Sequence, residues 1–220
     1  MIFLLAGILI YLSFPRFIAS IKTLYSDVLV YELDAGALPP EMALLKAQGD
    51  LGEAIDWSDS SYYRGQINYL QVQYFLNYTA NITDIEDALA DIMQGSNLAL
   101  SLMPVAPYVW YDRALMDSMY PERVARTLTA IKMSVYADRV NQNLLKARVL
   151  FLWDNKEAWD DESRSIFKAQ LMLLWELKRR QLIQVLKSNP ELGSWLVDGL
   201  STSPDELVKL ERLLKKLKLP

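Results

Sequence analysis

Cysteine and histidine are both absent from the 220-residue chain. Their absence excludes disulfides, thiolate nucleophiles and Ser-His-Asp or Cys-His catalysis. It also removes the ligands on which most zinc, copper and haem sites depend. Hard-ion sites built from carboxylates and carboxylate acid–base chemistry remain open. We expect no metal site and no cofactor, and composition alone does not identify a reaction.

Glycine and net positive charge are also scarce. The chain has eight glycines and no Gly-rich phosphate-binding loop, which argues against nucleotide-driven chemistry. Its 27 acidic and 23 basic residues give a formal charge of −4, whereas a nucleic-acid-binding protein needs a basic face to neutralise phosphates. Apolar residues make up 52% of the chain and charged residues 23%, so the composition is that of an ordinary folded protein.

An apolar N-terminus is the most distinctive feature that is present. The first fourteen residues, MIFLLAGILIYLSF, include twelve apolar residues and no charge. As a helix they cover about 21 Å, and continuation to Ile21 gives about 31 Å, close to the roughly 30 Å of a bilayer core. The extension includes Pro15, which membrane helices tolerate, and Arg16, whose side chain can reach the headgroups. We expect an uncleaved single-pass membrane anchor at residues 1–21.

Other interpretations of this segment remain open. A cleaved signal peptide would carry a basic segment before the apolar stretch and an A-x-A site after it. A core helix that docks on its own domain, in a soluble cytosolic adaptor, would normally keep a polar face. The positive-inside rule applied to Arg16 and Lys22 would place the following side in the cytoplasm, but two charges decide little.

The rest of the chain has the pattern of successive helices. No alternation of apolar and polar residues is long enough for a sheet. Capping boxes pair Thr83 with Glu86 and Ser203 with Glu206, and prolines mark further helix starts. We expect helices at residues 2–33, 39–48, 50–56, 61–78, 84–102, 107–119, 121–135, 138–153, 161–187, 190–199 and 204–218.

The short connections predict antiparallel neighbours, that is, stacked helical hairpins. Residues 41–55, 87–93 and 123–131 have the spacing of the second helix of a tetratricopeptide (TPR) repeat, with large aromatic residues on the helix before. Six small residues on these second helices would let neighbouring helices approach closely: Ala47, Ala54, Ala88, Ala90, Ala125 and Ala130.

This pattern predicts an all-α fold with three parts. Residues 1–36 hold the anchor and the helix that follows, 37–200 form TPR-like stacked hairpins (an α-solenoid), and 201–220 form an amphipathic capping helix. The last helix carries leucines on one face and basic residues on the other. Its leucines would close the apolar end of the stack, and the alternative is contact with anionic lipid.

Several segments, in order along the chain, carry a resemblance to a known family. They are the apolar N-terminus, AQGDLGEAIDWS at 47–58, PVAPYVWYDRAL at 104–115, IKMSV at 131–135 and LLKARVLFLW at 144–153, followed by Gln170 and Trp175. Over about residues 5–188 the chain resembles the membrane-anchored, TPR-like accessory proteins encoded with bacterial exopolysaccharide biosynthesis machinery (the VpsP type). The resemblance implies a non-enzymatic role in assembly or export of an extracellular polysaccharide, and it supplies no catalytic residue. With it we expect the anchor at residues 1–21 in a bacterial inner membrane and the following domain on the periplasmic side.

Exposed side chains on the first helices of the hairpins are candidates for binding a partner protein. We expect a helix or extended segment of a polysaccharide synthesis or export component there, and neither nucleic acid nor a small-molecule ligand. The candidate residues are Tyr62, Tyr63, Tyr69, Tyr111 and Arg113.

Two features near these candidates have structural explanations. Trp110 with Tyr108 and Tyr111 is the densest aromatic cluster along the chain, and core packing is favoured there over stacking on sugars. Arg113 and Arg148 lie on helices with apolar flanks and must be paired if they are buried. Their candidate acidic partners are Asp112, Asp117 and Asp138.

The alternative function is that of a carbohydrate-binding or carbohydrate-active protein that uses aromatic and carboxylate residues. Five acids lie between Asp154 and Glu162, and a pair held about 5 to 9.5 Å apart in a cleft could cleave a glycosidic bond. These acids flank a helix start, where carboxylates favour the positive end of the helix dipole, and they lack the residue order of a calcium loop. A solvated, structural role is therefore favoured.

Overall fold

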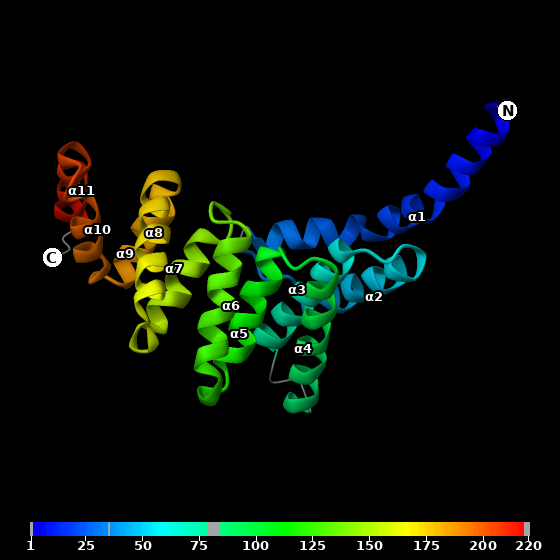
Figure 1. The fold of residues 1–220 in the computed structure, drawn as a ribbon, viewed down its shortest axis with the longest axis horizontal. Coiled ribbons are helices and arrows are strands. Elements are labelled where there is room, and N and C mark those ends of the chain that lie inside the picture. The colour runs from blue at the N-terminus through cyan, green and yellow to red at the C-terminus, as the bar shows by residue number, and fades with distance from the viewer. Residues whose placement is uncertain (1, 35, 79–83, 218–220) are drawn as a thin grey trace. The chain divides into compact units, whose positions relative to one another are not determined.

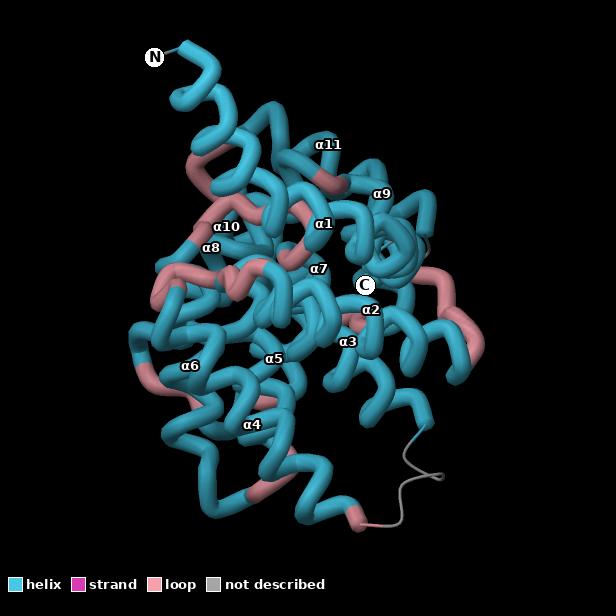
Figure 2. The backbone as a smooth tube through the Cα atoms, turned by 90° about the vertical axis from the view of Figure 1, so that its right-hand side faces the viewer, coloured by secondary structure: helices cyan, strands magenta, loops and turns pink. Residues whose placement is uncertain are grey.

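The computed structural model describes residues 2–34, 36–78 and 84–217, and all regular structure in this part of the chain is helical (Figures 1 and 2). The all-α expectation is confirmed. The helices form two compact units, Met1–Arg123 and Val124–Pro220. The division at Arg123 falls inside the segment 37–200 that the sequence predicts as one repeat domain.

The first unit is a series of helices in which each packs mainly against its neighbours along the chain. The α1–α2–α3 core includes Leu29, Leu51 and Leu70, and Phe75 and Met116 belong to a second cluster that joins α3 to α4 and α5. The described elements are α1 (Ile2–Asp34), α2 (Glu41–Trp57), α3 (Ser61–Tyr78), α4 (Ile85–Leu102), α5 (Pro107–Ser118) and the 3-10 turn η2 (Pro121–Arg123).

Helix α1 contacts α2 along only part of its length. Small side chains such as Ala19 and Ser26 are fully buried on the inner face of α1, so the two helices approach closely. The contact ends near Phe14, whose ring centroid lies 6.3 Å from that of Trp57 at the end of α2. Before Phe14, α1 extends beyond α2 (Figure 1).

The second unit has a core rich in aromatic residues. Trp153, Trp159, Phe167 and Trp195 pack together with ring centroids 4.7 to 6.5 Å apart, which joins α7, α8 and α10. The described elements are α6 (Val124–Ala137), α7 (Leu145–Asp154), the 3-10 turn η3 (Lys156–Ala158), α8 (Asp161–Leu177), α9 (Arg179–Ser188), α10 (Leu192–Leu200) and α11 (Pro204–Leu217).

The structure departs from the predicted helices mainly at three places. The predicted break near Gly49 is wrong, because the buried stripe that includes Ala47 and Leu51 continues through an uninterrupted α2. The predicted helix 161–187 divides at Lys178, where the backbone leaves the helical region (φ −135°, ψ 46°) without any proline or glycine. Helix α7 starts at Leu145 rather than at 138, because residues 138–144 form turns in which Asn141 Oδ1 accepts two main-chain N–H groups.

The predicted close helix contacts and caps are partly confirmed. Ala47, Ala54 and Ala130 are buried, but Ala90 and Ala125 are exposed, because the register of their helices turns other residues inward. Thr83 lies outside the described residues, and the Asp84 carboxylate caps α4 by accepting a hydrogen bond from the Asp87 amide at 3.1 Å.

Helix α11 turns its leucines inward. Leu210 and Leu214 are buried, α11 packs against α10, and its basic residues are exposed. This geometry is the one expected of a helix that closes an apolar face.

Candidate binding cavity

The first unit contains an apolar cavity of about 270 Å³ between α1, α3 and the start of α5. Val30 of α1, the first turns of α3 and the segment from Met103 to Val109 form its walls. We call it the Gln66 cavity, after the residue that supplies its buried polar atom.

Local sequence explains how the space is kept open. Pro107 occupies the first turn of α5, which fixes the start of that helix beside α3. Gly65 on α3 faces α5 without a side chain, and a Cβ atom added there would lie 3.6 Å from Val109 Cγ2. A larger residue at position 65 would therefore project into the cavity.

The polar edge of the cavity is a three-residue hydrogen-bond cluster. The Tyr62 hydroxyl donates to Asp27 Oδ1 at 2.9 Å, and Gln66 Nε2 donates to the same oxygen at 2.8 Å and to the Tyr62 oxygen at 2.7 Å. Burial and the hydrogen bond to the Asp27 carboxylate raise the pKa of Tyr62 to about 12, so its hydroxyl stays protonated. Gln66 Oε1 is buried and has no hydrogen-bond partner among the described residues.

The sequence-predicted site residues separate into two groups. Tyr62 and Tyr69 line the Gln66 cavity, and Tyr69 contacts the ring of Tyr108, another lining residue, at 6.4 Å between centroids. Tyr63 packs against the α1–α2–α3 core and contacts the Tyr62 ring at 5.7 Å. Tyr111 and Arg113 lie on α5, outside the residues that line the cavity.

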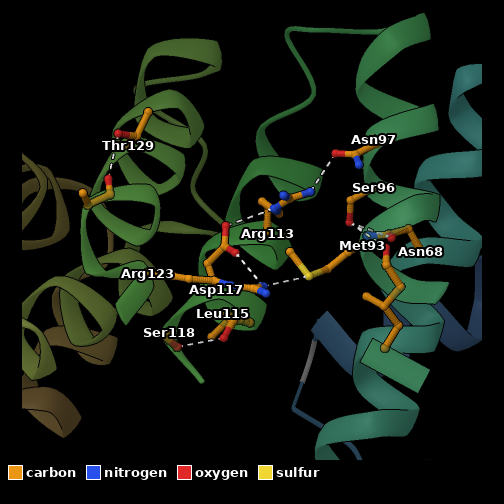
Figure 3. A network of polar contacts seen from close by, with 12 residues as sticks. Asn68, Met93, Ser96, Asn97, Arg113, Leu115, Asp117, Ser118, Arg123 and Thr129 are labelled. Atoms are coloured by element: carbon orange, nitrogen blue, oxygen red, sulfur yellow. Dashed lines mark hydrogen bonds and ion pairs between the residues drawn. The ribbon is translucent and has the colours of Figure 1, made fainter. Parts of the chain in front are cut away.

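Arg113 belongs to a separate polar cluster (Figure 3). Its guanidinium donates to Asp117 Oδ2 at 3.0 Å and to Asn97 Oδ1 at 2.7 Å, and Arg123 reaches the other oxygen of Asp117 at 3.5 Å. Asp117 is almost fully buried. The predicted structural ion pair of Arg113 is confirmed with Asp117, but it lies within α5 and the link to α4 is made through Asn97.

The aromatic residue Trp110 has a structural role at the start of α5. Its indole N–H donates to the carbonyl of Pro104 at 2.7 Å, which closes the turn before the helix. The densest aromatic cluster of the described residues is the one around Trp159 and Phe167 in the second unit rather than the one at Trp110.

Two of the five clustered acids converge on a lysine. Lys132 Nζ lies 2.6 Å from Asp160 Oδ2 and 2.5 Å from Glu162 Oε2. The hydrogen bond from Lys132 is the main cause that holds the pKa of Asp160, and also that of Glu162, below its ordinary value. The general acid of a glycosidase needs a raised carboxyl pKa, whereas both carboxyl pKa values are lowered here, so this pair is unsuited to that role.

Comparisons with known proteins found no match for this chain among family models, curated proteins or solved structures. Within the described residues, no three acidic side chains are grouped as a metal site would require. The Gln66 cavity is thus the feature of the described residues with the clearest capacity to bind another molecule.

Sequence analysis did not identify Asp27 and Gln66 as site residues. Asp27 is the first acidic residue of the chain and follows a long apolar stretch. A carboxylate at that position of a packed helix needs hydrogen-bond donors, which is the signal that could have found it. Gln66 carries no comparable signal, because an amide on a polar helix usually faces solvent.

Proposed function

We propose that the protein is a membrane-anchored helical adaptor whose Gln66 cavity receives an apolar side chain of a partner protein. The observation that carries the proposal is an apolar cavity with one buried, unpartnered carbonyl oxygen, Gln66 Oε1. A buried acceptor without a donor is costly, and a partner that supplies an N–H group would remove this cost.

The size of the cavity favours a side chain over a free ligand. Sites for drug-sized ligands measure about 300–1,000 Å³, and the Gln66 cavity lies just below this range at about 270 Å³. A leucine or phenylalanine side chain fits such a volume. An extended segment of a partner can insert that side chain and, after a turn of the Gln66 side chain that exposes the buried Oε1, donate a main-chain N–H group to it.

Membrane attachment is the second part of the proposal. Residues Gly7–Leu33 of α1 are long and apolar enough to cross a bilayer. A crossing by residues 1–21 would require α2 to leave α1, because Ala19 is buried and Phe14 contacts Trp57 of α2, and both residues lie inside that span. The part of α1 before Phe14 is free of α2 and covers about 18 Å as a helix. We place the inserted segment there.

The repeat architecture and the cellular role extend the proposal. Successive helices of the first unit, from α1 to α5, pack as neighbours, which supports TPR-like stacked hairpins there. The resemblance to exopolysaccharide accessory proteins supports a role in polysaccharide synthesis or export, with the helical units in the periplasm and the N-terminus in the inner membrane. The partner is then a component of that machinery.

The experiment fills the cavity, and circular dichroism with thermal unfolding checks that the fold is kept. Gly65→Leu places a side chain in the cavity and improves helix propensity, and Gly49→Leu is the matched control on α2, where the added side chain meets open space. A photoreactive amino acid at Met103, a partly exposed lining residue, should cross-link to one partner in cells. We expect Gly65→Leu to reduce that product about tenfold, which corresponds to about 1.4 kcal/mol of binding free energy.

Two readouts separate the parts of the proposal. Equal cross-linking of the Gly65→Leu and Gly49→Leu proteins would exclude the cavity as the binding site. An unchanged amount and chain length of secreted polysaccharide after deletion of the coding region would exclude the polysaccharide role and leave the binding role in place.

Carbohydrate binding is the second candidate function, and the three tyrosine rings around the cavity favour it. Tyr62, Tyr69 and Tyr108 could stack on a sugar ring, with Gln66 Oε1 accepting a hydroxyl hydrogen bond. Titration of the intact protein with polysaccharide fragments, in parallel with Gly65→Leu, tests it. Saturable binding that Gly65→Leu abolishes would replace the protein partner by a sugar.

A further inference from the structure

The outer face of α1 carries a continuous stripe of large apolar side chains. Successive members are separated alternately by four and three residues, and each side chain is between 49% and 76% exposed. The members of this α1 stripe are Ile10, Phe14, Phe17, Ile21, Leu24, Val28 and Tyr31.

The inner face of the same helix carries small or hydroxyl-bearing buried side chains between Ala19 and Ser26, and Leu29 beyond them belongs to the core. Ala19, Thr23 and Ser26 are buried against the rest of the first unit, although two of them carry hydroxyl groups. Their hydroxyls donate to main-chain carbonyls within α1 at 2.9 to 3.1 Å and are thereby satisfied. The seven residues of the stripe are thus directed away from the unit that α1 helps to build, and the described residues cover them only in part, as Trp57 covers Phe14.

The spacing of the stripe specifies the geometry of its partner. A straight α-helix drifts by about 20° per seven residues relative to a strict heptad repeat, so a stripe that keeps the heptad needs a supercoiled partner helix. Ile21 and Val28 occupy the a positions and Leu24 a d position between them. β-Branched residues at a with leucine at d favour two parallel strands.

A flat bilayer surface suits this face less well. Interfacial helices carry lysine and arginine beside their apolar face, whereas Asp27 and Glu32 flank the C-terminal part of the α1 stripe. Near Glu32, on the same side of the stripe, Lys46 of α2 lies over the Tyr25 ring with Nζ 4.4 Å from the centroid. The charged residues beside this half of the stripe are therefore better placed in water than in a bilayer.

We infer that α1 pairs with α1 of a second copy of the chain as a parallel coiled coil. With about 100 Å² left on each of seven large side chains, two copies would cover about 1,400 Å², within the 1,200–2,000 Å² of stable interfaces. Asp27 of each copy would face Glu32 of the other copy across the coiled-coil interface, which is unfavourable. Hydrogen bonds from Tyr62 and Gln66 hold Asp27 toward α3, which reduces this repulsion.

The natural absence of cysteine gives a clean test of the pairing. Phe17→Cys, Leu24→Cys and Tyr31→Cys are introduced one at a time into the full chain in detergent, with Met42→Cys on the exposed face of α2 as the control. In a parallel pair each of these d positions faces its own copy within the 4.4–6.8 Å between Cα atoms that a disulfide requires. We expect a disulfide-linked dimer from all three variants after mild oxidation and none from the control.

Other outcomes overturn the inference in distinguishable ways. Cross-linking at Leu24 alone would show an antiparallel pair, and equal cross-linking of Met42→Cys would show random collision. A monomer in sedimentation analysis of the unmodified protein would exclude pairing altogether. As a second variant, Leu24→Asp with Val28→Asp should convert the dimer to a monomer with unchanged helical circular dichroism, because both side chains are exposed.

Discussion

At the scale of single residues, Arg148 shows how a charge can be held inside a helical unit. Its side chain is fully buried, and its guanidinium donates to Ser134 Oγ at 3.1 Å, to the Ser134 carbonyl at 2.5 Å and to the Asp138 carbonyl at 2.8 Å. Ser134 and Asp138 lie at and just beyond the end of α6, where the last carbonyls of a helix have no partner within it. Arg148 therefore ties α7 to the C-terminal end of α6.

Removal of this side chain should destabilise the protein strongly. Arg148→Ala leaves buried acceptors without donors and opens a cavity, and we expect a loss of about 3 kcal/mol in the free energy of unfolding. Arg148→Lys should not restore stability, because an ammonium group lacks the planar fork that reaches several acceptors. Urea denaturation measures both, with exposed Arg126→Ala expected within about 0.5 kcal/mol of the unsubstituted protein. A loss below about 1 kcal/mol for Arg148→Ala would contradict this role.

The same residue marks the limit of prediction from sequence. The sequence indicates that a buried Arg148 needs partners and includes Asp138 among them, but it does not reveal that Asp138 contributes its main-chain carbonyl. Tyr62 and Tyr69 were predicted as site residues because aromatic residues on such helices are easily recognised. Gln66 and Asp27 depend on the packing of α1 against α3, which no local pattern encodes.

At the scale of helices, apolar periodicity predicts that a helix is present better than it predicts the residues at which the helix begins and ends. Helix α3 has the predicted bounds of residues 61–78, because turn residues precede it and its pattern is unbroken. Helix α2 continues through Gly49 because its buried stripe outweighs the cost of one exposed glycine, about 1 kcal/mol. The division at Lys178 has no proline or glycine to signal it and arises from tertiary packing.

The start of α8 gives a pH-dependent prediction at this scale. Asp160 caps α8 by accepting a hydrogen bond from the Ser163 amide at 2.8 Å, and Lys132 of α6 bridges Asp160 and Glu162. The pKa of each carboxyl group is lowered in the folded state from 3.8 and 4.5, respectively. The stabilisation is therefore present above these values and is lost as the pH falls below them.

Lys132→Met should reduce this pH dependence. Unfolding midpoints in urea between pH 6 and pH 2.5 should fall less steeply for Lys132→Met than for the unsubstituted protein, because the main cause of the lowered pKa values is gone. Lys168→Met, which removes an exposed pair with Asp198, serves as the matched control. Parallel pH profiles for the Lys132→Met and unsubstituted proteins would contradict the role of the bridge.

At the scale of the whole molecule, α1 combines three surfaces on one helix. Its inner face builds the core of the first unit, its outer face carries the α1 stripe, and its first residues extend beyond α2. The sequence shows a long apolar helix, but it does not show at which residue this helix begins to pack against the rest of the first unit. The buried pattern of Ala19, Thr23 and Ser26 supplies that boundary, because a bilayer and α2 cannot cover the same segment.

The depth of membrane insertion follows from this boundary. Leu9→Cys lies before the contact with α2, and Ser20→Cys lies beside it on an exposed part of α1. In membrane vesicles we expect a membrane-impermeant maleimide to label Ser20→Cys and to leave Leu9→Cys unlabelled, since charged pairs such as Lys22 with Glu53 keep the second position in water. Detergent should make both cysteines reactive. Protection of Ser20→Cys in vesicles would instead show that residues 1–21 cross the bilayer and that α2 moves away from α1 when the protein enters the membrane.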